Sequence, residues 1–420
     1  MTLAHDSRQL GTGMHEEHSD DRAIDHSGQE ETKEEGDREQ SCSLVSGDGT
    51  PSGLISLRRC LHQALTSQSS VLSASTLSKI SPSGQLRRIG AGSCGTVFKI
   101  PETHKCIKIA PVHQDPVNER LLAVRAHKEF SYVRELMEDL FKIMLPRVPM
   151  PHELASPAEA LWESFPQTRF PESYKLPRRP SALVSTRIFP LSKTVREVLV
   201  RLFFPPDIHA KTLADETSKN CLIRLYLGAN APENATRHRD SLENFPLYHD
   251  MATEILLPVD EYAKSMAVAL AVLHWAARCS GEDSEWVLGR APVEDEAALP
   301  VNCKRPGACL WLLDFDKAKS LDFDDHDDEF CLLRMLAGVT NNDPYLPNPK
   351  SSSRELWELF RQTYKDASER VMANYKHTLP SRFFGQGVDL PEAFLQKWEN
   401  GPVMTKNLKL YLSNVYSSIY

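Results

Sequence analysis

The sequence feature that most constrains the fold is a glycine-rich stretch within residues 88–110. Gly90, Gly92 and Gly95 form the spacing G-x-G-x-x-G. Glycine adopts backbone angles closed to other residues and lets main-chain N–H groups approach an anion closely. A dinucleotide-binding fold shares this spacing but continues from the third glycine into a helix. Here the β-branched and aromatic run 96–100 follows, which predicts a strand.

The next strand carries a lysine close to the glycine turn. Residues 101–104 predict a turn and residues 105–110 predict a returning strand, so the glycines cap a β-hairpin. Val97 comes two residues after the last glycine, and Lys108 lies on the returning strand. This order resembles the amino-terminal lobe of protein kinases, in which a glycine-rich loop covers the phosphates and a strand lysine pairs with them. The alternative is an ordinary hairpin with a solvated lysine.

A long helix is predicted after the hairpin, from about Val117 to Ile143. It carries one apolar stripe, made of Leu122, Ala126, Val133 and Leu136. Glu129 falls on the same stripe, where a carboxylate needs a partner. The helix at this place in protein kinases holds the strand lysine through a glutamate, so the resemblance implies a Lys108–Glu129 ion pair. Glu119 is the alternative partner.

The segments that follow predict a change from strands to helices. The proline-rich stretch 146–180 indicates an irregular insertion that wraps the surface. Residues 183–188 and 221–228 predict strands, and residues 193–204 predict a helix. In a kinase-like fold, the first strand and this helix would form the connection between two lobes.

The triplet His238-Arg239-Asp240 spells the catalytic motif of protein kinases, but its position argues against that role. Asn244 comes four residues after the aspartate, whereas the motif requires five. The long apolar helix that precedes the kinase catalytic loop is predicted only later, at residues 261–278. The triplet therefore predicts a solvated turn.

The catalytic-loop position falls instead at residues 277–288. Alignment with the kinase pattern puts Ser280 where the base aspartate belongs, and serine does not accept a proton as a carboxylate does. Asp283 and Glu282 are the nearby acids that could replace it. Glu285 stands in place of the kinase asparagine and keeps an oxygen ligand for Mg²⁺.

A buried strand that ends in acids follows at residues 310–316. Asp314-Phe315-Asp316 resembles the kinase motif D-F-G, with aspartate in place of glycine. Asp314 would then hold the metal that bridges the phosphates; the alternative is an aspartate that caps a turn. The resemblance thus implies ATP and Mg²⁺ as cofactors. The acidic run 322–329 predicts a solvated loop.

Composition limits the other classes of function. The net charge of −8 over 420 residues argues against nucleic acid or an anionic membrane as the partner. The nine cysteines include no C-x-x-C pair, which argues against a zinc ribbon and favours free thiols in a reducing compartment. The first ten residues have no apolar core, and the apolar run 266–277 is too short to span a bilayer. We expect a cytoplasmic or nuclear protein.

Several short motifs together resemble a fungal family of unknown function often labelled zinc finger protein. They span residues 85–400 and include 187–191, 221–228, 244–247, 273–275, 285–288, 312–316 and 342–345. Members of that family tend to carry aspartate where this chain has Ser280, and the family implies no settled activity.

The sequence therefore predicts an α+β, two-lobed, protein-kinase-like fold: a small antiparallel β-lobe with one long helix, and a larger mainly helical lobe. We expect a disordered acidic tail at 1–50, a linker with a short docking helix at 51–84, the β-rich lobe at 85–190 and the helical lobe at 191–420.

Three functions are consistent with this reading. The first is a nucleotide-binding, pseudokinase-like regulator with an unknown protein partner. The second is an active phosphotransferase that uses Asp283 or Glu282 as base. The third is a scaffold that binds no nucleotide.

Overall fold

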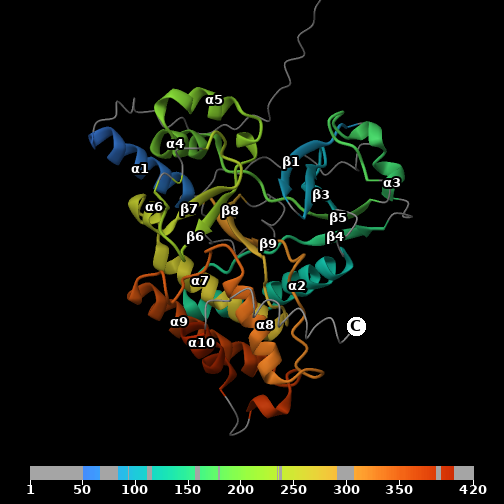
Figure 1. Ribbon diagram of the computed structural model, residues 1–420, viewed down its shortest axis with the longest axis vertical. Coiled ribbons are helices and arrows are strands. Elements are labelled where there is room, and N and C mark those ends of the chain that lie inside the picture. Colours follow the sequence, from blue (N-terminus) through green and yellow to red (C-terminus); the bar gives the residue numbers. More distant parts are fainter. Residues whose placement is uncertain are drawn as a thin grey trace, which may run out of the picture. The chain divides into compact units, whose positions relative to one another are not determined.

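The computed structural model describes residues 51–66, 84–92, 94–110, 116–156, 161–177, 180–233, 235, 239–290, 307–384 and 389–401. All of them belong to one unit of the chain, Ser41–Tyr420. Within these ranges the protein is built of two sheets and a set of helices, which confirms the predicted α+β class (Figure 1). The predicted tail 1–50 and His238 lie outside the described residues.

The first sheet contains the predicted hairpin. Its order is β1-β2-β3-β5-β4, antiparallel throughout. The strands are β1 (Arg87–Gly92), β2 (Gly95–Lys99), β3 (Lys105–Ala110), β4 (Pro151–Ala155) and β5 (Ser181–Thr186). Gly95 has a φ of +136°, and a Cβ there would lie 2.4 Å from the carbonyl oxygen of Ile109. Only glycine therefore fits at this position, where the start of β2 approaches the backbone of β3.

One face of this sheet is buried against the proline-rich segment. Phe98 and Ile107 on neighbouring strands are fully buried. Phe170, from the proline-rich segment, lies edge-on to Phe98 at 5.1 Å between ring centroids. The prediction of a segment that merely wraps the surface is wrong, because the segment supplies edge strand β4 and buried aromatic rings to this core. The prolines argued against a strand in the sequence, but β4 is an edge strand, and edge strands tolerate proline.

Helix α2 (Pro116–Phe141) packs on the same sheet, against β4 and β5. Its observed bounds agree with the prediction to within two residues. The predicted docking helix is α1 (Pro51–Thr66), which buries Leu57, Leu61 and Leu65 and contacts α4 (Lys193–Phe203). The spacing of four between these leucines puts them on one face of the helix.

The second sheet brings two predicted site segments together. Its order is β7-β6-β8-β9, with β6 (Ile223–Tyr226) and β7 (Phe245–Tyr248) parallel. The antiparallel pair β8 (Glu285–Gly289) and β9 (Cys309–Leu313) aligns Glu285 with Leu313. The first residue of β8 therefore lies next to Asp314, which follows the end of β9.

Helices around this sheet form the larger core. Buried helix α7 (Val259–Ala271) continues into the π-helical turn Val272–Ala276 and packs on α9 (Arg354–Asn374). The remaining helices are α3 (Leu161–Ser164), α5 (His209–Ala214), α6 (His249–Glu254), α8 (Asp328–Thr340) and α10 (Leu390–Asn400). Short 3₁₀ turns occur at Gln167–Arg169, Pro206–Ile208, Ser218–Asn220 and Ser381–Phe384. Across the described ranges, no helix has both the length and the apolar composition needed to cross a bilayer.

Close packing of α8 against the segment after α7 yields a prediction. A Cβ on Gly338 would lie 1.9 Å from the carbonyl oxygen of Ser280. We expect Gly338→Ala to lower the free energy of unfolding by about 1–3 kcal/mol, because the backbone of residues 280–282 must move. Urea unfolding measures the change. Gly92→Ala is the control, since a Cβ there meets nothing within 4 Å. Equal stability of the two variants would contradict the packing argument.

Candidate functional site

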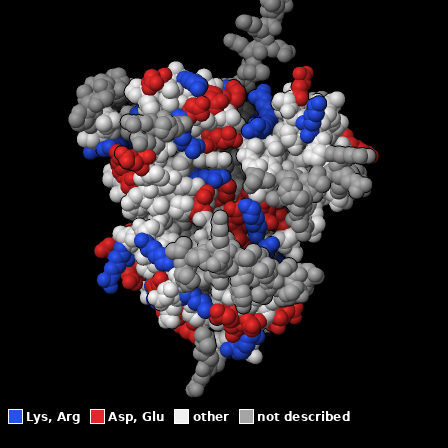
Figure 2. Space-filling view, viewed as in Figure 1, with Lys and Arg blue, Asp and Glu red and all other residues white. Residues whose placement is uncertain are grey.

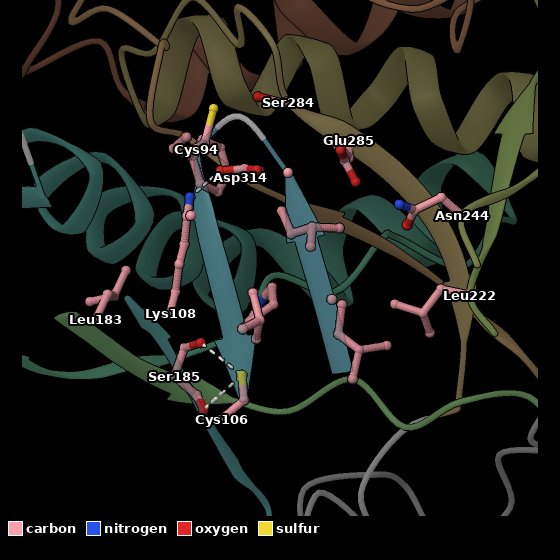
Figure 3. Close-up of a pocket in the computed structure, with 18 of the residues that line it drawn as sticks. Cys94, Cys106, Lys108, Leu183, Ser185, Leu222, Asn244, Ser284, Glu285 and Asp314 are labelled. Carbon is pink, nitrogen blue, oxygen red and sulfur yellow. Dashed lines mark hydrogen bonds and ion pairs between the residues drawn. The ribbon is translucent and has the colours of Figure 1, made fainter. Parts of the chain in front are cut away.

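A pocket of about 500 Å³ is lined by residues from both sheets. Gly90, Gly92 and Gly95 line it, together with Val97 from β2. Apolar side chains form another part of the wall, namely Leu183, Ile188 and Leu222. Figure 3 shows Leu222 and Asn244 at a distance from the charged group around Lys108. The pocket thus combines an apolar wall with a charged region, as sites for small organic ligands commonly do.

Lys108 is the centre of the charged region. Its Nζ donates to Asp314 Oδ1 at 2.7 Å and to Glu119 Oε1 at 2.9 Å. The lysine comes from β3, Glu119 from the first turn of α2, and Asp314 from the residue after β9. Figure 3 shows Lys108 extending along the sheet toward Asp314. One ammonium group therefore links both sheets and the long helix.

Burial and mutual attraction together shift the pKa values of Lys108, Glu119 and Asp314. Burial lowers the pKa of Lys108, but the carboxylates of Asp314 and Glu119 outweigh that effect and raise it above its ordinary value. Burial raises the pKa of Glu119 to about 7 although Lys108 opposes the shift. Burial likewise raises the pKa of Asp314. The ammonium is thus held charged, while its two partners bind protons more tightly than free carboxyls do.

The predicted Lys108–Glu129 pair is wrong, and the alternative partner, Glu119, is the one observed. Glu119 is buried at the start of α2, where the helix faces the pocket. Glu129 lies ten residues, or about 15 Å, farther along the helix, and accepts a hydrogen bond from the Tyr375 hydroxyl. The apolar stripe identified the buried face only in part, because Leu136 is 50% exposed whereas its other members are buried. Only the tertiary structure shows which end of the buried face reaches the lysine.

Of the two acids predicted as the base, only Asp283 lines the pocket. Asp283 is a pocket residue, with a φ of +61°, and its carboxylate accepts from Lys317 at 2.5 Å. Glu282 is not part of the described wall and accepts from Asn341 at 3.1 Å. Ser280 is buried, and its Oγ accepts from the Lys319 N–H at 3.0 Å, which is a structural role.

Glu285 lines the pocket and forms an ion pair with Arg224. Its Oε1 accepts from Arg224, which also contacts Asp343 at 3.3 Å. The Tyr226 hydroxyl donates to the same Asp343 carboxylate at 2.7 Å. Burial raises the pKa of Glu285 to about 7, and Arg224 opposes that shift. Oε2 of Glu285 makes no hydrogen bond among the described residues and remains available as a ligand.

Sequence reasoning missed two residues that organise the site. Arg224 was assigned only to a strand, although an arginine in a buried strand needs an acidic partner. Asn342 appeared only within one of the motifs of the family resemblance, with no role assigned to it. Its Oδ1 accepts from the Asp283 N–H, and its Nδ2 donates to the carbonyls of Gly281 and Ser284 at 3.2 and 3.3 Å. Asn342 thereby holds the turn that presents Asp283.

His274 and Asp240, two residues of catalytic type, lie outside the pocket wall. His274 is fully buried, its Nδ1 lies 2.9 Å from the Tyr364 hydroxyl, and burial lowers its pKa to about 3. Asp240 pairs with Lys211 at 3.2 Å, outside the pocket wall, so this part of the H-R-D triplet does not meet the candidate site.

On the face shown in Figure 2, acidic and basic side chains of the described residues alternate without forming a continuous surface of one sign.

Comparison with known proteins gives one match. A family of unknown function described as "Zinc finger protein" matches residues 310–376, which include Asp314, α8 and α9. The matched segment contains two of the motifs on which the sequence resemblance rested, and the remaining motifs lie outside it. No curated protein matches the chain, and no solved structure matches it.

The raised pKa of Glu119 predicts a pH dependence. The folded chain binds this proton more tightly than the unfolded chain, whose glutamate has a pKa of about 4.5. The stability contributed by this group is therefore present below pH 4.5 and lost as the pH rises through about 7. Glu119→Gln does not titrate, so we expect its melting temperature to fall less steeply than that of the wild type between about pH 5 and pH 8. Parallel curves would contradict the assignment.

Proposed function

We propose that the pocket binds a magnesium nucleotide in a protein-kinase-like fold, and that the protein is a pseudokinase-like regulator whose phosphoryl transfer is weak or absent. The observation that carries this proposal is the contact between Lys108 and Asp314 at 2.7 Å, beneath the glycine-rich hairpin. These two residues are separated by 206 positions in the chain. A strand lysine and a strand-end aspartate that meet under a glycine turn are the parts needed to position phosphates and their cation.

The residues present fit a hard divalent cation. Lys108 occupies only Oδ1 of Asp314, and Oδ2 makes no hydrogen bond among the described residues. Glu285 keeps its Oε2 in the same way. The charge of Asp314 contributes to the raised pKa of Glu285, so the two carboxylates interact. Carboxylate oxygens are the protein ligands that Mg²⁺ prefers, and the bound ion would neutralise charge on the phosphates.

The proposed division of labour follows from the chemistry of each group. The N–H groups of the glycine turn would face the phosphates, and the Lys108 ammonium would pair with them. Val97, Leu183 and Leu222 offer apolar surface for a base. Ser280 is buried and hydrogen-bonded where a kinase has its base, which favours binding without efficient transfer.

Nucleotide binding is tested by thermal stability with ATP, with and without Mg²⁺. A ligand at about 100 times its Kd stabilises the folded chain by about 2.7 kcal/mol. We expect Mg-ATP to raise the melting temperature of the wild type and to have little effect on Lys108→Met or Asp314→Asn. Glu129→Gln is the matched control, because that glutamate contacts Tyr375 and not the pocket. No shift in the wild type would favour the scaffold function instead.

A second candidate function, active phosphoryl transfer, is favoured by the position of Asp283. Its side chain lines the pocket and is 39% exposed, so a substrate hydroxyl could reach it. If the protein transfers phosphate, Asp283→Asn should lower the rate about 10²–10⁴-fold, while Glu282→Gln should retain activity. Phosphate release and incorporation measured by mass spectrometry follow the reaction. Equal rates for wild type and Asp283→Asn would exclude this aspartate as the base.

A further inference from the structure

Three potential metal ligands meet at the edge of the pocket. The Sγ of Cys94 and carboxylate oxygens of Asp283 and Asp316 all lie within 4.8 Å of one another. Cys94 belongs to the turn between β1 and β2, Asp283 precedes β8, and Asp316 follows β9. Cys94 is buried, and the two aspartates are half-buried. Figure 3 shows the Cys94 side chain near Asp314, beside the Lys108 ammonium.

Asp316 supplies an independent reason to expect a cation here. Both of its carboxylate oxygens are buried, and neither has a hydrogen-bond partner among the described residues. Asp316 forms no ion pair in that part of the chain either. Native structures pair buried carboxylates, hydrogen-bond them or use them to bind metals.

The neighbouring ammonium groups do not supply that partner. Lys108 is already shared between Glu119 and Asp314. Lys317 donates to Oδ2 of Asp283 at 2.5 Å. Its charge also attracts Asp316 and Cys94, but it makes no hydrogen bond to either carboxylate oxygen of Asp316. The carboxylates of Asp283, Asp314 and Asp316 outnumber these two ammonium groups, which leaves an excess of negative charge at this edge of the pocket. A divalent cation would offset it.

We propose that Cys94, Asp283 and Asp316 bind Zn²⁺. A thiolate ligand favours Zn²⁺ over Mg²⁺ or Ca²⁺, and carboxylates complete borderline-soft zinc sites. Zinc bonds of 2.0–2.3 Å put tetrahedral ligand atoms about 3.3–3.8 Å apart. Because the three ligand atoms lie within 4.8 Å of one another, each pair needs to approach by at most about 1.5 Å to bind one zinc ion. The fourth position is open to water or to another ligand.

Zinc bound in this way would act on the glycine-rich turn. Cys94 is the ligand from the first sheet, and the two aspartates come from segments that flank the second sheet. The ion would tie the β1–β2 turn to the opposite wall of the pocket. This site is distinct from the Asp314–Glu285 pair proposed for Mg²⁺, and it does not require that the protein bind a nucleotide.

The experiment uses the full chain, freed of metal by chelation and then titrated with Co²⁺ and Zn²⁺ without nucleotide. We expect a cobalt–thiolate charge-transfer band that Zn²⁺ abolishes, and a melting temperature raised by Zn²⁺ but not by Mg²⁺. Cys94→Ser should lose the band, and Asp316→Asn should weaken Zn²⁺ binding by more than about tenfold. Cys106→Ser is the matched control, because that pocket cysteine contacts Ser185.

Two further outcomes decide the proposal. Lys317→Gln removes a competing positive charge, so it should strengthen Zn²⁺ binding and keep the site intact. A charge-transfer band unchanged in Cys94→Ser, or wild-type protein that shows no band and no Zn²⁺ stabilisation, would overturn the zinc site. Neither result depends on ATP, so failure of the zinc site and failure of nucleotide binding are distinguishable.

Discussion

The sharing of the Lys108 ammonium between Glu119 and Asp314 is the interaction on which the rest of the site depends. Its three members come from β3, α2 and the segment after β9. Charges removed from water are stable only when paired and hydrogen-bonded, so this contact constrains how the first sheet, the long helix and the second sheet approach one another. The pocket lies where those elements meet, with Lys108, Glu119 and Asp314 in its wall.

The same requirement explains the backbone near the site. Asp283 and Asp314 have φ values of +61° and +65°, a region that residues other than glycine seldom adopt. Asn342 holds the first turn through three hydrogen bonds, and Lys108 holds the carboxylate of the second. Gly338 has no side chain and so lets α8 approach the carbonyl oxygen of Ser280 closely. Local strain is thus maintained by specific partners, and the consequence is that acidic side chains face the pocket.

The two proposals assign different tasks to neighbouring acids. Asp314 and Glu285 each have one oxygen engaged by a basic residue, which suits a hard cation that bridges to phosphate. Neither oxygen of Asp316 accepts a hydrogen bond within the described ranges, and Asp316 lies near a thiol, which suits zinc. Since Cys94 lies on the glycine turn, a zinc ion there would influence access to the region where the phosphates are proposed to bind. The two sites would therefore be coupled through one loop.

The sequence by itself determined the local elements. The β-branched and aromatic run 96–100 and the turn 101–104 specified the hairpin. The apolar spacing within 117–143 specified helix α2, and residues 261–278 specified the long apolar helix. These features depend on neighbours a few positions apart, which a single sequence displays. It also indicated two site residues: Lys108, on the strand that returns from the glycine turn, and Asp314, which follows a buried strand.

Only the tertiary structure decided which of these groups meet. The choice of Glu119 over Glu129 depends on which end of one helical face reaches β3, and hydrophobic periodicity is the same at both ends. The roles of Arg224 and Asn342, and the meeting of Cys94 with Asp283 and Asp316, join segments far apart in the chain. Pairings of this kind depend on how sheets and helices pack, and no local pattern encodes them.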